Sequence, residues 1–523
     1  MFLQNYITTA NLDNKSFIKR LAELGKPQEN FILANINEFK QGEFLKNIKK
    51  AQDYYDSKHD ILDKKRYYID RQGTKREDEH LTNTTLVHPY FKKLVNQKVN
   101  YLLAKEFTLQ VNENDSKAVK FKEDCSKYFD RTFMRKLKSI GKQAIINGIA
   151  WVQVYYNEKG KLGFKRIPTE EVIPFWHDAE HTVLDGLIRF YTITEYLPDN
   201  DKVEVIKVEY YTLEGVWYYE IRDGHLRLDR NKVSVENPYK GHFQSQEQDE
   251  KGTLITTERV WERIPFVAFK YNDEETSLLN DVKTLIDNYD KVTSDTGDMI
   301  SDVPNAIKVV TGYGGTDKGE FSQNLATYRT IFVEEGGSVQ LLQSEADTTA
   351  TEAHLARLKE DIYEVGNGVN IQKDVLNATS GVALKIRYAD LDADCMAMGA
   401  NFGAGIEELC WFIQSDLSSE QDIDEVEFDV IFNADGIINE TDVVMNCKNS
   451  VGVISNETII ANHPWITDLD VELKRVEKQK EEEQELLENE IFGVNSTNKE
   501  SNRQQVQGTP KEQSKNAKLG RDK

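Results

Sequence analysis

The chain has 523 residues, which is more than a single hydrophobic core usually organises, so we expect two or more packed regions. Its 23 Phe and 23 Tyr residues exclude a disordered chain, and its four scattered cysteines, which form no CxxC pair, exclude a disulfide framework and a structural zinc site. The formal net charge of -23 excludes a protein that grips nucleic acid over its whole surface, because such proteins present a basic face.

The first half of the chain predicts a mixture of helices and strands. Apolar residues at helical spacing predict helices within 30–70 and over 90–104. From residue 150 onward, apolar alternation predicts a hairpin over 151–167 and further strands over 202–228. No signal-peptide pattern opens the chain, and no apolar run approaches the roughly 18 residues of a membrane span, so we expect a cytosolic product.

A long amphipathic helix is predicted from Leu278 to the helix-breaking Pro304. Its apolar residues recur at alternating steps of four and three, which is typical of a seam that packs against another helix. Aspartates lie between the seam positions, so we expect a mostly acidic face away from the seam. The carboxylates that define this predicted face are Asp281, Asp287, Asp295 and Asp298.

A small β element is predicted between this helix and a second one. Residues 306–311, 330–335 and 338–343 have the composition of strands, and Gly336-Gly337 supplies a tight turn. A second seam helix begins at Thr349. If the two helices run side by side, the β element projects from the tip of a helical hairpin about 35 Å long, at about 1.5 Å rise per residue.

The last part of the chain predicts a loop, a long helix and a polar tail. Residues 366–381 are polar and marked by glycine, which indicates a loop. The following helix has a seam from Tyr388 to Ile413, interrupted by glycines that invite a kink or a close helix contact. A strand at 426–432, short helices and a final helix over 468–490 are expected next, and the composition of 493–523 is typical of disorder.

Residues with recognisable catalytic spacing are missing from the sequence. It contains no GxxxxGK[ST], GxSxG or HExxH motif. His59-Asp60 resembles one pair of a metal-dependent phosphohydrolase, but only His80 and His88 stand near it, so we interpret these histidines as surface or helix-terminal residues. We therefore predict that the protein is not an enzyme and has no catalytic residues, cofactor or metal.

Several blocks in order resemble the bacteriophage portal proteins of the SPP1 type. They are YYDSKHDIL from Tyr54, YFKKLVNQKVNYLLAKEF from Tyr90, INGIAW from Ile146, the helix over 278–298, ATSGVALKIRY from Ala378, and GVISNET from Gly452 with Pro464 and Glu472. Together they span roughly residues 50 to 480. Ser57 stands where the family often has glycine, which affects only a local turn.

The resemblance implies an α+β portal fold that assembles as a ring, usually of twelve subunits. It also divides the chain into named parts, which we match to the predicted elements. These are a mixed αβ wing (1–275), a stem helix (276–303), a small β clip (304–346), a second stem helix (347–368), a tunnel loop (369–380), a long wing helix and strand (381–435), an α-helical crown (436–490) and a disordered tail (491–523).

The function implied is a channel at one capsid vertex through which double-stranded DNA is packaged and ejected. The expected partners are the large subunit of the terminase motor, capsid and scaffolding proteins, and later the head-tail connector, but no membrane; the location is the virion, after assembly in the host cytoplasm. An acidic stem face lets DNA pass without counterion-releasing contacts. The tunnel loop is expected to touch phosphates without sequence preference through Asn370, Gln372, Lys373 and Asn377, with Lys385 and Arg387 behind it.

Alternatives remain open at this point. The chain is either a portal protein, another ring-forming connector or capsid protein, or a metal-dependent nuclease acting through His59 and Asp60. In the alternative interpretation of the loop, Lys373 is an ordinary solvated residue, and Lys385 and Arg387 pair with Asp390 or Asp392.

Overall fold

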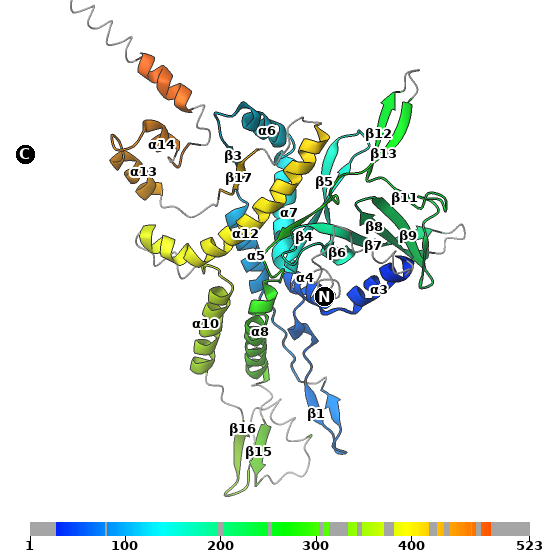
Figure 1. Ribbon diagram of the computed structural model, residues 1–523. Coiled ribbons are helices and arrows are strands. Elements are labelled where there is room, and N and C mark those ends of the chain that lie inside the picture. The colour runs from blue at the N-terminus through cyan, green and yellow to red at the C-terminus, as the bar shows by residue number, and fades with distance from the viewer. Residues whose placement is uncertain are drawn as a thin grey trace, which may run out of the picture. The chain divides into compact units, whose positions relative to one another are not determined.

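The computed structural model of the chain describes residues 28–78, 81–196, 202–248, 254–302, 307–312, 319, 333–342, 348–370, 381–417, 426–433, 440–461, 463–466 and 472–482. The chain divides into two compact units, Met1–Ala378 with Ala383–Gly436, and Thr379–Val382 with Ile437–Lys523. The first unit mixes helices and sheets, as predicted (Figure 1). Within the described ranges, no helix is both long enough and apolar enough to cross a membrane.

The helices of the N-terminal half begin at capping residues and end at glycine where the sequence supplies them. They are α3 (Gln28–Gln41), α4 (Glu43–Tyr55), α5 (Tyr90–Leu102), α6 (Ser116–Ser126) and α7 (Arg131–Asn147), with single 3-10 turns η1 (Asp60–Asp63) and η2 (Thr169–Glu171). Asp115 accepts a hydrogen bond from the Lys117 amide at the start of α6, and Asp130 accepts one from the Phe133 amide at the start of α7. Gly148, with φ of 88°, ends α7 and turns the chain into a strand.

The largest sheet is antiparallel. Its strands are β6 (Val172–Trp176), β7 (Leu184–Tyr196), β8 (Lys202–Thr212), β9 (Gly215–Arg222), β10 (His225–Leu228) and β11 (Tyr239–Lys240). The order is β10-β9-β8-β7-β6, and β11 also pairs with β9. Asp223 and Gly224 have φ of 53° and 77°, so they form the tight turn that the sequence predicts there.

Smaller sheets surround this one. The order β14-β4-β5 joins β14 (Phe266–Lys270) to the predicted hairpin of β4 (Ile149–Tyr156) and β5 (Leu162–Ile167). The two-stranded pairs are β1 (Tyr67–Ile69) with β2 (Lys75–Glu77), β12 (Phe243–Gln248) with β13 (Leu254–Arg259), β15 (Ile307–Thr311) with β16 (Ser338–Leu342), and β17 (Phe428–Ile431) with β3 (Thr108–Val111).

One long helix, α12 (Gly381–Asp416), runs through the main core. The predicted seam is confirmed, because its members are all buried: Tyr388, Leu391, Cys395, Met398, Phe402, Ile406, Leu409 and Ile413. The glycines do not break the helix, which is continuous over 36 residues. Gly405 instead allows close packing, since a Cβ atom there would lie 2.7 Å from the Phe269 ring of β14.

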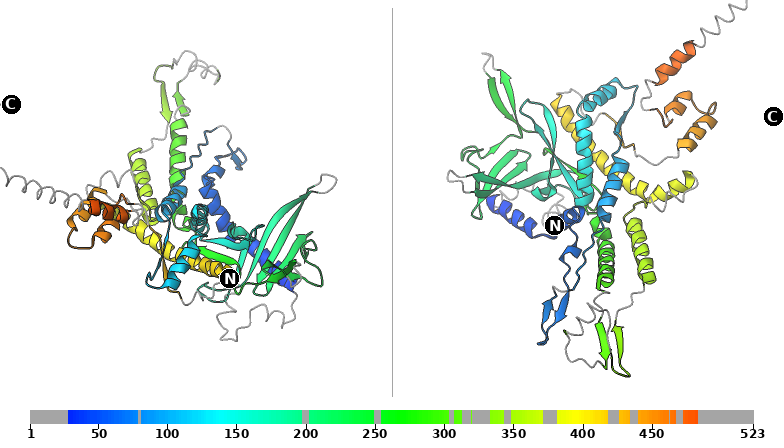
Figure 2. Two further views of the ribbon diagram at one scale, coloured as in Figure 1. Left: turned by 90° about the horizontal axis from the view of Figure 1, so that it is seen from above. Right: turned by 180° about the vertical axis from the view of Figure 1, so that it is seen from behind.

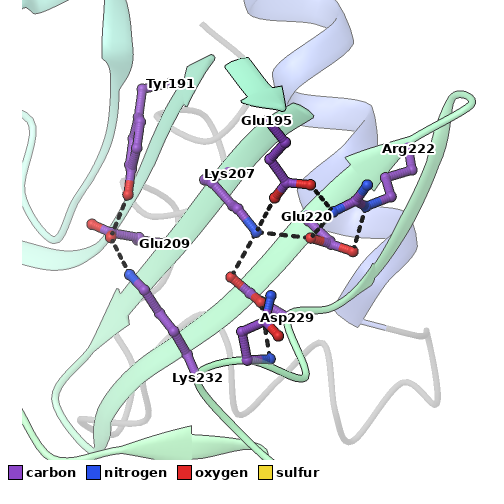
Figure 3. Close-up of polar contacts among 9 residues, drawn as sticks. Tyr191, Glu195, Lys207, Glu209, Glu220, Arg222, Asp229 and Lys232 are labelled. Carbon is purple, nitrogen blue, oxygen red and sulfur yellow. Dashed lines mark hydrogen bonds and ion pairs between the residues drawn. The ribbon is translucent and has the colours of Figure 1, made fainter. Parts of the chain in front are cut away.

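The two faces of the large sheet are covered differently. One face packs on α3, where Ile32 and Ile36 meet apolar residues of the sheet. The other face holds a cluster of charged residues, which we call the sheet network (Figure 3). Its members are Tyr191, Glu195, Lys207, Glu209, Glu220, Arg222, Asp229 and Lys232.

The predicted order of helix, β element and helix is present. The helices are α8 (Leu279–Asp302) and α10 (Thr348–Val365), and β15 pairs with β16 between them in the sequence. The strand predicted at 330–335 is wrong in its described part, because 333–335 form no strand and lead into the turn at Gly336. In the second unit, α13 (Glu440–Asn449), α14 (Asn456–Ala461) and residues 472–482 are helical. The predicted disorder of the tail concerns residues outside the described ranges.

Candidate functional site

The two long helices α8 and α10 pack side by side, as their seams predict. Ile286 of α8 and Ile362 of α10 are fully buried. Tyr90 of α5 contacts both helices, because its ring centroid lies 5.1 Å from that of Tyr289 on α8 and 6.1 Å from that of Tyr363 on α10. The helical pair is therefore fixed to the body of the first unit by an aromatic cluster.

A second set of contacts holds α8 to the segment of residues 54–88. Polar residues along one side of α8 bond to this segment, and we call these residues and their partners the α8 ladder. On α8 the ladder consists of Lys283, Asp287, Asp290, Ser294, Asp295 and Asp298, and on the segment of Tyr54, His59, Asp60, Lys64, Thr84, Leu86 and His88. For example, Ser294 Oγ accepts a hydrogen bond from the Leu86 amide at 2.9 Å.

The ladder corrects the prediction of an acidic face on α8. The side chain of Asp298 is buried, and it accepts hydrogen bonds from Lys64 Nζ at 2.7 Å and from the Thr84 amide at 2.6 Å. Although burial acts against ionisation, these bonds lower the pKa of Asp298 below its ordinary value. Asp298 thus stays ionised in order to bind its own chain, and it is no part of an open acidic surface.

The other predicted carboxylates differ in how far they are engaged. Asp287 accepts hydrogen bonds from the Tyr54 hydroxyl and from Lys283, and Asp295 forms an ion pair with Lys64 at 2.7 Å. Asp281 is exposed as a residue, but partial burial of its carboxyl and the nearby charge of Asp394 raise the pKa of that carboxyl. Whether any of these residues faces a channel stays a prediction.

A buried histidine and carboxylate cluster lies at the middle of the ladder. Neither the His59 side chain nor the Asp290 side chain is exposed, and His59 Nδ1 lies 2.5 Å from Asp290 Oδ2. The backbone amide of His88 donates to Asp290 Oδ1 at 2.9 Å, and His88 Nδ1 lies 2.8 Å from the same oxygen. The Tyr54 ring stacks on His59 at 4.4 Å. His59 is therefore not a surface residue, but it does stand at a helix end, directly before the 3-10 turn η1.

The nuclease alternative required His59 and Asp60 to act on one ion. The structure directs them to different partners, since Asp60 binds Lys50 at 2.7 Å and Lys283 at 2.8 Å. Among the described residues, no three His, Cys, Asp or Glu side chains are grouped so that they could hold a metal ion. His80 lies outside the described ranges.

The base of the predicted polar loop is anchored on α5. The Gln97 side chain both donates to the Val369 carbonyl and accepts from the Val369 amide, each at 3.0 Å. Lys98 is fully buried and donates to Asp394 of α12 at 2.6 Å and to the Asn367 carbonyl at 3.4 Å. Residues 366–370 are thus clamped to α5 and, through Lys98, to α12.

Two glycines allow this clamp to close. A Cβ atom on Gly366 would lie 2.6 Å from a Leu94 methyl carbon, and one on Gly368 would lie 2.3 Å from the other. Between them, Asn367 adopts a positive φ of 46°, which asparagine tolerates better than most residues. The Gly-Asn-Gly sequence indicated a loop with unusual backbone conformation, but it could not show that these glycines pack against Leu94 of α5.

The structure treats the predicted DNA-contacting residues of the loop differently. The prediction is corrected for Asn370, because this residue is only 7% exposed and belongs to the packed base of the loop instead of an open surface. Arg387 is exposed on α12. Lys385 lies in α12, but its side chain is outside the described part of the structure, as are Gln372, Lys373 and Asn377. Asp392, one suggested partner of Lys385 and Arg387, accepts a hydrogen bond from Tyr101 at 2.8 Å.

Comparison with known proteins gives one consistent result. Residues 39–486 match the family described as phage portal protein, SPP1 Gp6-like. The chain is 28% identical to the portal protein of Bacillus phage SPP1 over 472 residues, covering 89% of each chain. It is 26% identical to the portal protein of Clostridium phage phiCD119 over 438 residues, covering 81% of this chain and 90% of the relative.

Similarity to solved structures is weaker. A chain from the neck of an empty GTA particle, computed with C6 symmetry, is 10% identical, with 71% of this chain and 88% of that chain covered and a TM-score of 0.40. A chain from the neck of a native GTA particle gives a TM-score of 0.37. The family match extends over most of the sequence and confirms a structural portal protein over the nuclease alternative. The chain therefore belongs to the SPP1 Gp6-like family of phage portal proteins.

Proposed function

We propose that copies of this chain form a closed ring, of twelve subunits as in the family, at one vertex of a phage capsid, and that double-stranded DNA passes through its centre. The observation that supports this most directly is the pair α8 and α10 with β15 and β16 between them, in a chain that matches the portal family over residues 39–486. In this proposal α8 and α10 are the stem, β15 and β16 belong to the clip, and the large sheet belongs to the wing.

A conduit for DNA must pass its cargo without holding it. Each phosphate contact adds affinity through counterion release, so few cations should face the channel. In the α8 ladder the cations Lys64 and Lys283 are already bound by carboxylates of the same chain, which supports a stem that offers DNA little to grip. Asp281, which is exposed, contributes repulsion.

The polar loop after residue 370 is the proposed point of weak DNA contact. Its base is rigid, because Gln97 and Lys98 fix residues 367–369. Repeated around a ring, Lys373 would form a band of positive charge, held in place by the rigid base of each loop. Gln372 and Asn377 would lie beside it, with Lys385 and Arg387 behind them. Such a band meets phosphates without sequence preference.

The proposed partners are those that membership of the portal family implies. The terminase large subunit would dock on the clip during packaging, and the head-tail connector would replace it there; capsid and scaffolding proteins would surround the wing. The protein would assemble in the host cytoplasm and remain in the virion at the capsid vertex. The exposed carboxylates of the chain suit protein partners better than tight DNA binding.

A packaging assay with Lys373→Glu tests the loop proposal. We expect normal ring assembly but altered DNA packaging or retention, with an effect that shrinks as salt rises because phosphate contacts are screened. Lys159→Glu, at the exposed turn between β4 and β5, is the matched control and should leave packaging unchanged. Unaltered packaging and retention in Lys373→Glu at both low and high salt would refute the role given to the loop.

A further inference from the structure

The hairpin of β1 and β2 exposes an apolar strand. Tyr67, Tyr68 and Ile69 are 49%, 46% and 75% exposed, although they are consecutive residues of β1. Successive side chains of a strand point to opposite faces, so both faces of the hairpin present apolar surface to solvent. A two-stranded hairpin is at best marginally stable alone, and this one pairs with no third strand in the described chain.

The residues that flank the hairpin are nevertheless held in place on α8. Lys64, just before β1, pairs with Asp295 and Asp298 of α8, and Thr84, after β2, donates its amide to Asp298. The two ends are tied together as well, since Asn83 donates to the Lys64 carbonyl at 2.7 Å. An exposed apolar strand whose ends are held in a fixed position is suited to binding a partner.

The position of the hairpin suggests which partner. Helix α8 lies between α10 on one side and the hairpin on the other, in all three views (Figures 1 and 2). Two different surfaces on opposite sides of one subunit are what a head-to-tail contact needs, and such contacts close into rings.

The exposed face of α10 complements the hairpin. Ala353, Ala356, Glu360 and Glu364 follow one another at helical spacing and are exposed, opposite the buried Leu358 and Ile362. The alanines leave room for large side chains, and Glu360 and Glu364 match the slight cationic excess of the hairpin, where Arg71, Lys75 and Arg76 outnumber Asp70 and Glu77. Arg357, on the same face, is already paired with Asp361 at 2.7 Å.

We infer that the β1–β2 hairpin of one copy docks on the exposed face of α10 in the next copy of this chain. The inference rests on the proposed ring. Tyr68 and Ile69 would lie over Ala353 and Ala356, and the hairpin cations would approach Glu360 and Glu364. DNA is the less favoured partner, because Tyr67, Tyr68 and Ile69 carry no cation for phosphate and part of the cationic charge is cancelled by Asp70, which binds Arg76 at 2.7 Å.

Site-specific photocrosslinking tests this contact. In assembled full-length protein, Tyr68→p-benzoylphenylalanine should give covalent dimers and larger multimers whose cross-linked peptides map to residues 348–365 of a second copy. Placing the same crosslinker at Tyr196, which is 71% exposed in the wing, gives the matched control and should produce no cross-link to that peptide. Cross-links only within one chain, to other regions of a second copy, or to DNA would overturn the inference.

A second variant separates this inference from the proposed ring. The double change Tyr68→Ser and Ile69→Asp removes only exposed side chains, so the melting temperature of the subunit should stay the same while its self-association weakens at least tenfold. If wild-type protein forms rings and the double variant associates equally well, the hairpin contact is refuted and the ring stands. If wild-type protein forms no ring at all, the proposed function itself fails.

Discussion

The sheet network and the α8 ladder are built from the same residue types, but they join very different parts of the chain. In the sheet network, Lys207 of β8 bonds to Glu220, 13 residues away on the neighbouring strand (Figure 3). In the α8 ladder, Lys64 bonds to Asp298, 234 residues away. The first cluster fixes the register of adjacent strands, whereas the second fixes a long helix to a distant segment.

The two clusters also differ in their contact with water. Each cluster has buried members, but their lysines differ. The side chains of Lys207 and its partner Asp229 are 9% and 4% exposed, whereas those of Lys64 and its partner Asp295 are 16% and 47% exposed. Losing one member of a buried pair leaves uncompensated charge, while water can solvate the partner left behind by a half-exposed pair. Substitution of Lys207 should therefore cost more stability than substitution of Lys64.

The largest effect is expected for Lys207→Met. Removing this ammonium leaves the buried carboxylate of Asp229 without its cation, and leaves Glu195 and Glu220 with Arg222 as their shared cation. We expect the free energy of unfolding to fall by about 3–5 kcal/mol, measured by chemical denaturation. Lys46→Met, which removes an exposed pair with Glu43, is the control and should have no measurable effect. A loss for Lys207→Met as small as for the control would contradict the comparison.

An intermediate effect is expected at the clamp below the polar loop. Gly366→Ala places a Cβ atom 2.6 Å from Leu94 and 2.8 Å from the Ile362 carbonyl oxygen, so it should destabilise the fold by about 1–3 kcal/mol through overpacking. Gly403→Ala is the opposite case, because its nearest neighbour is 3.7 Å away in the middle of α12. There alanine should stabilise the helix by up to about 1 kcal/mol. Thermal unfolding of both variants should show opposite signs; equal signs would mean that the clamp is looser than described.

A smaller effect is expected for Lys64→Met in the ladder. Water can solvate Asp295, which is 47% exposed, and the buried Asp298 keeps its hydrogen bond from the Thr84 amide, so the free energy of unfolding should fall by about 1–2 kcal/mol, less than for Lys207→Met. Lys65→Met, at the neighbouring position with an exposed partner, should leave stability unchanged. A loss at Lys64 that equals or exceeds the loss at Lys207 would reverse the ranking of the two clusters.

The smallest effect is a pH dependence at Asp298. A carboxyl whose pKa is lowered in the folded state contributes stability that is present above its unfolded pKa, about 3.9, and is lost as pH falls through the folded value. The difference in unfolding free energy between wild type and Asp298→Asn should therefore be constant at pH 5 to 7 and shrink below pH 4. A difference that stays constant down to pH 2 would show that the charge of Asp298 contributes nothing.

Periodicity predicted the elements, and it predicted them best where one face is apolar. The seam of α12 and the hairpin of β4 and β5 are present because burial requires regular spacing. The predicted seam of α8 is buried at its start, at Leu278 and Val282, whereas Met299 at its end is 36% exposed. Polar residues gave no such signal. Asp298 was interpreted as part of an acidic face and His59 as a surface or helix-terminal residue, because nothing local reveals that their partners lie more than 200 residues away. The glycines of α12 predicted a kink or a close helix contact, whereas the close contact of Gly405 is with Phe269 of a strand, which only the fold shows.

The central claim, a ring with a stem built from α8 and α10, is tested most directly by cryo-electron microscopy of the assembled full-length protein. We predict closed rings in which α8 and α10 line the central channel, with the segment of residues 54–88 bound along α8 in every subunit. Monomers at all concentrations, or rings whose channel is lined by the large sheet while α8 and α10 face outward, would contradict the account.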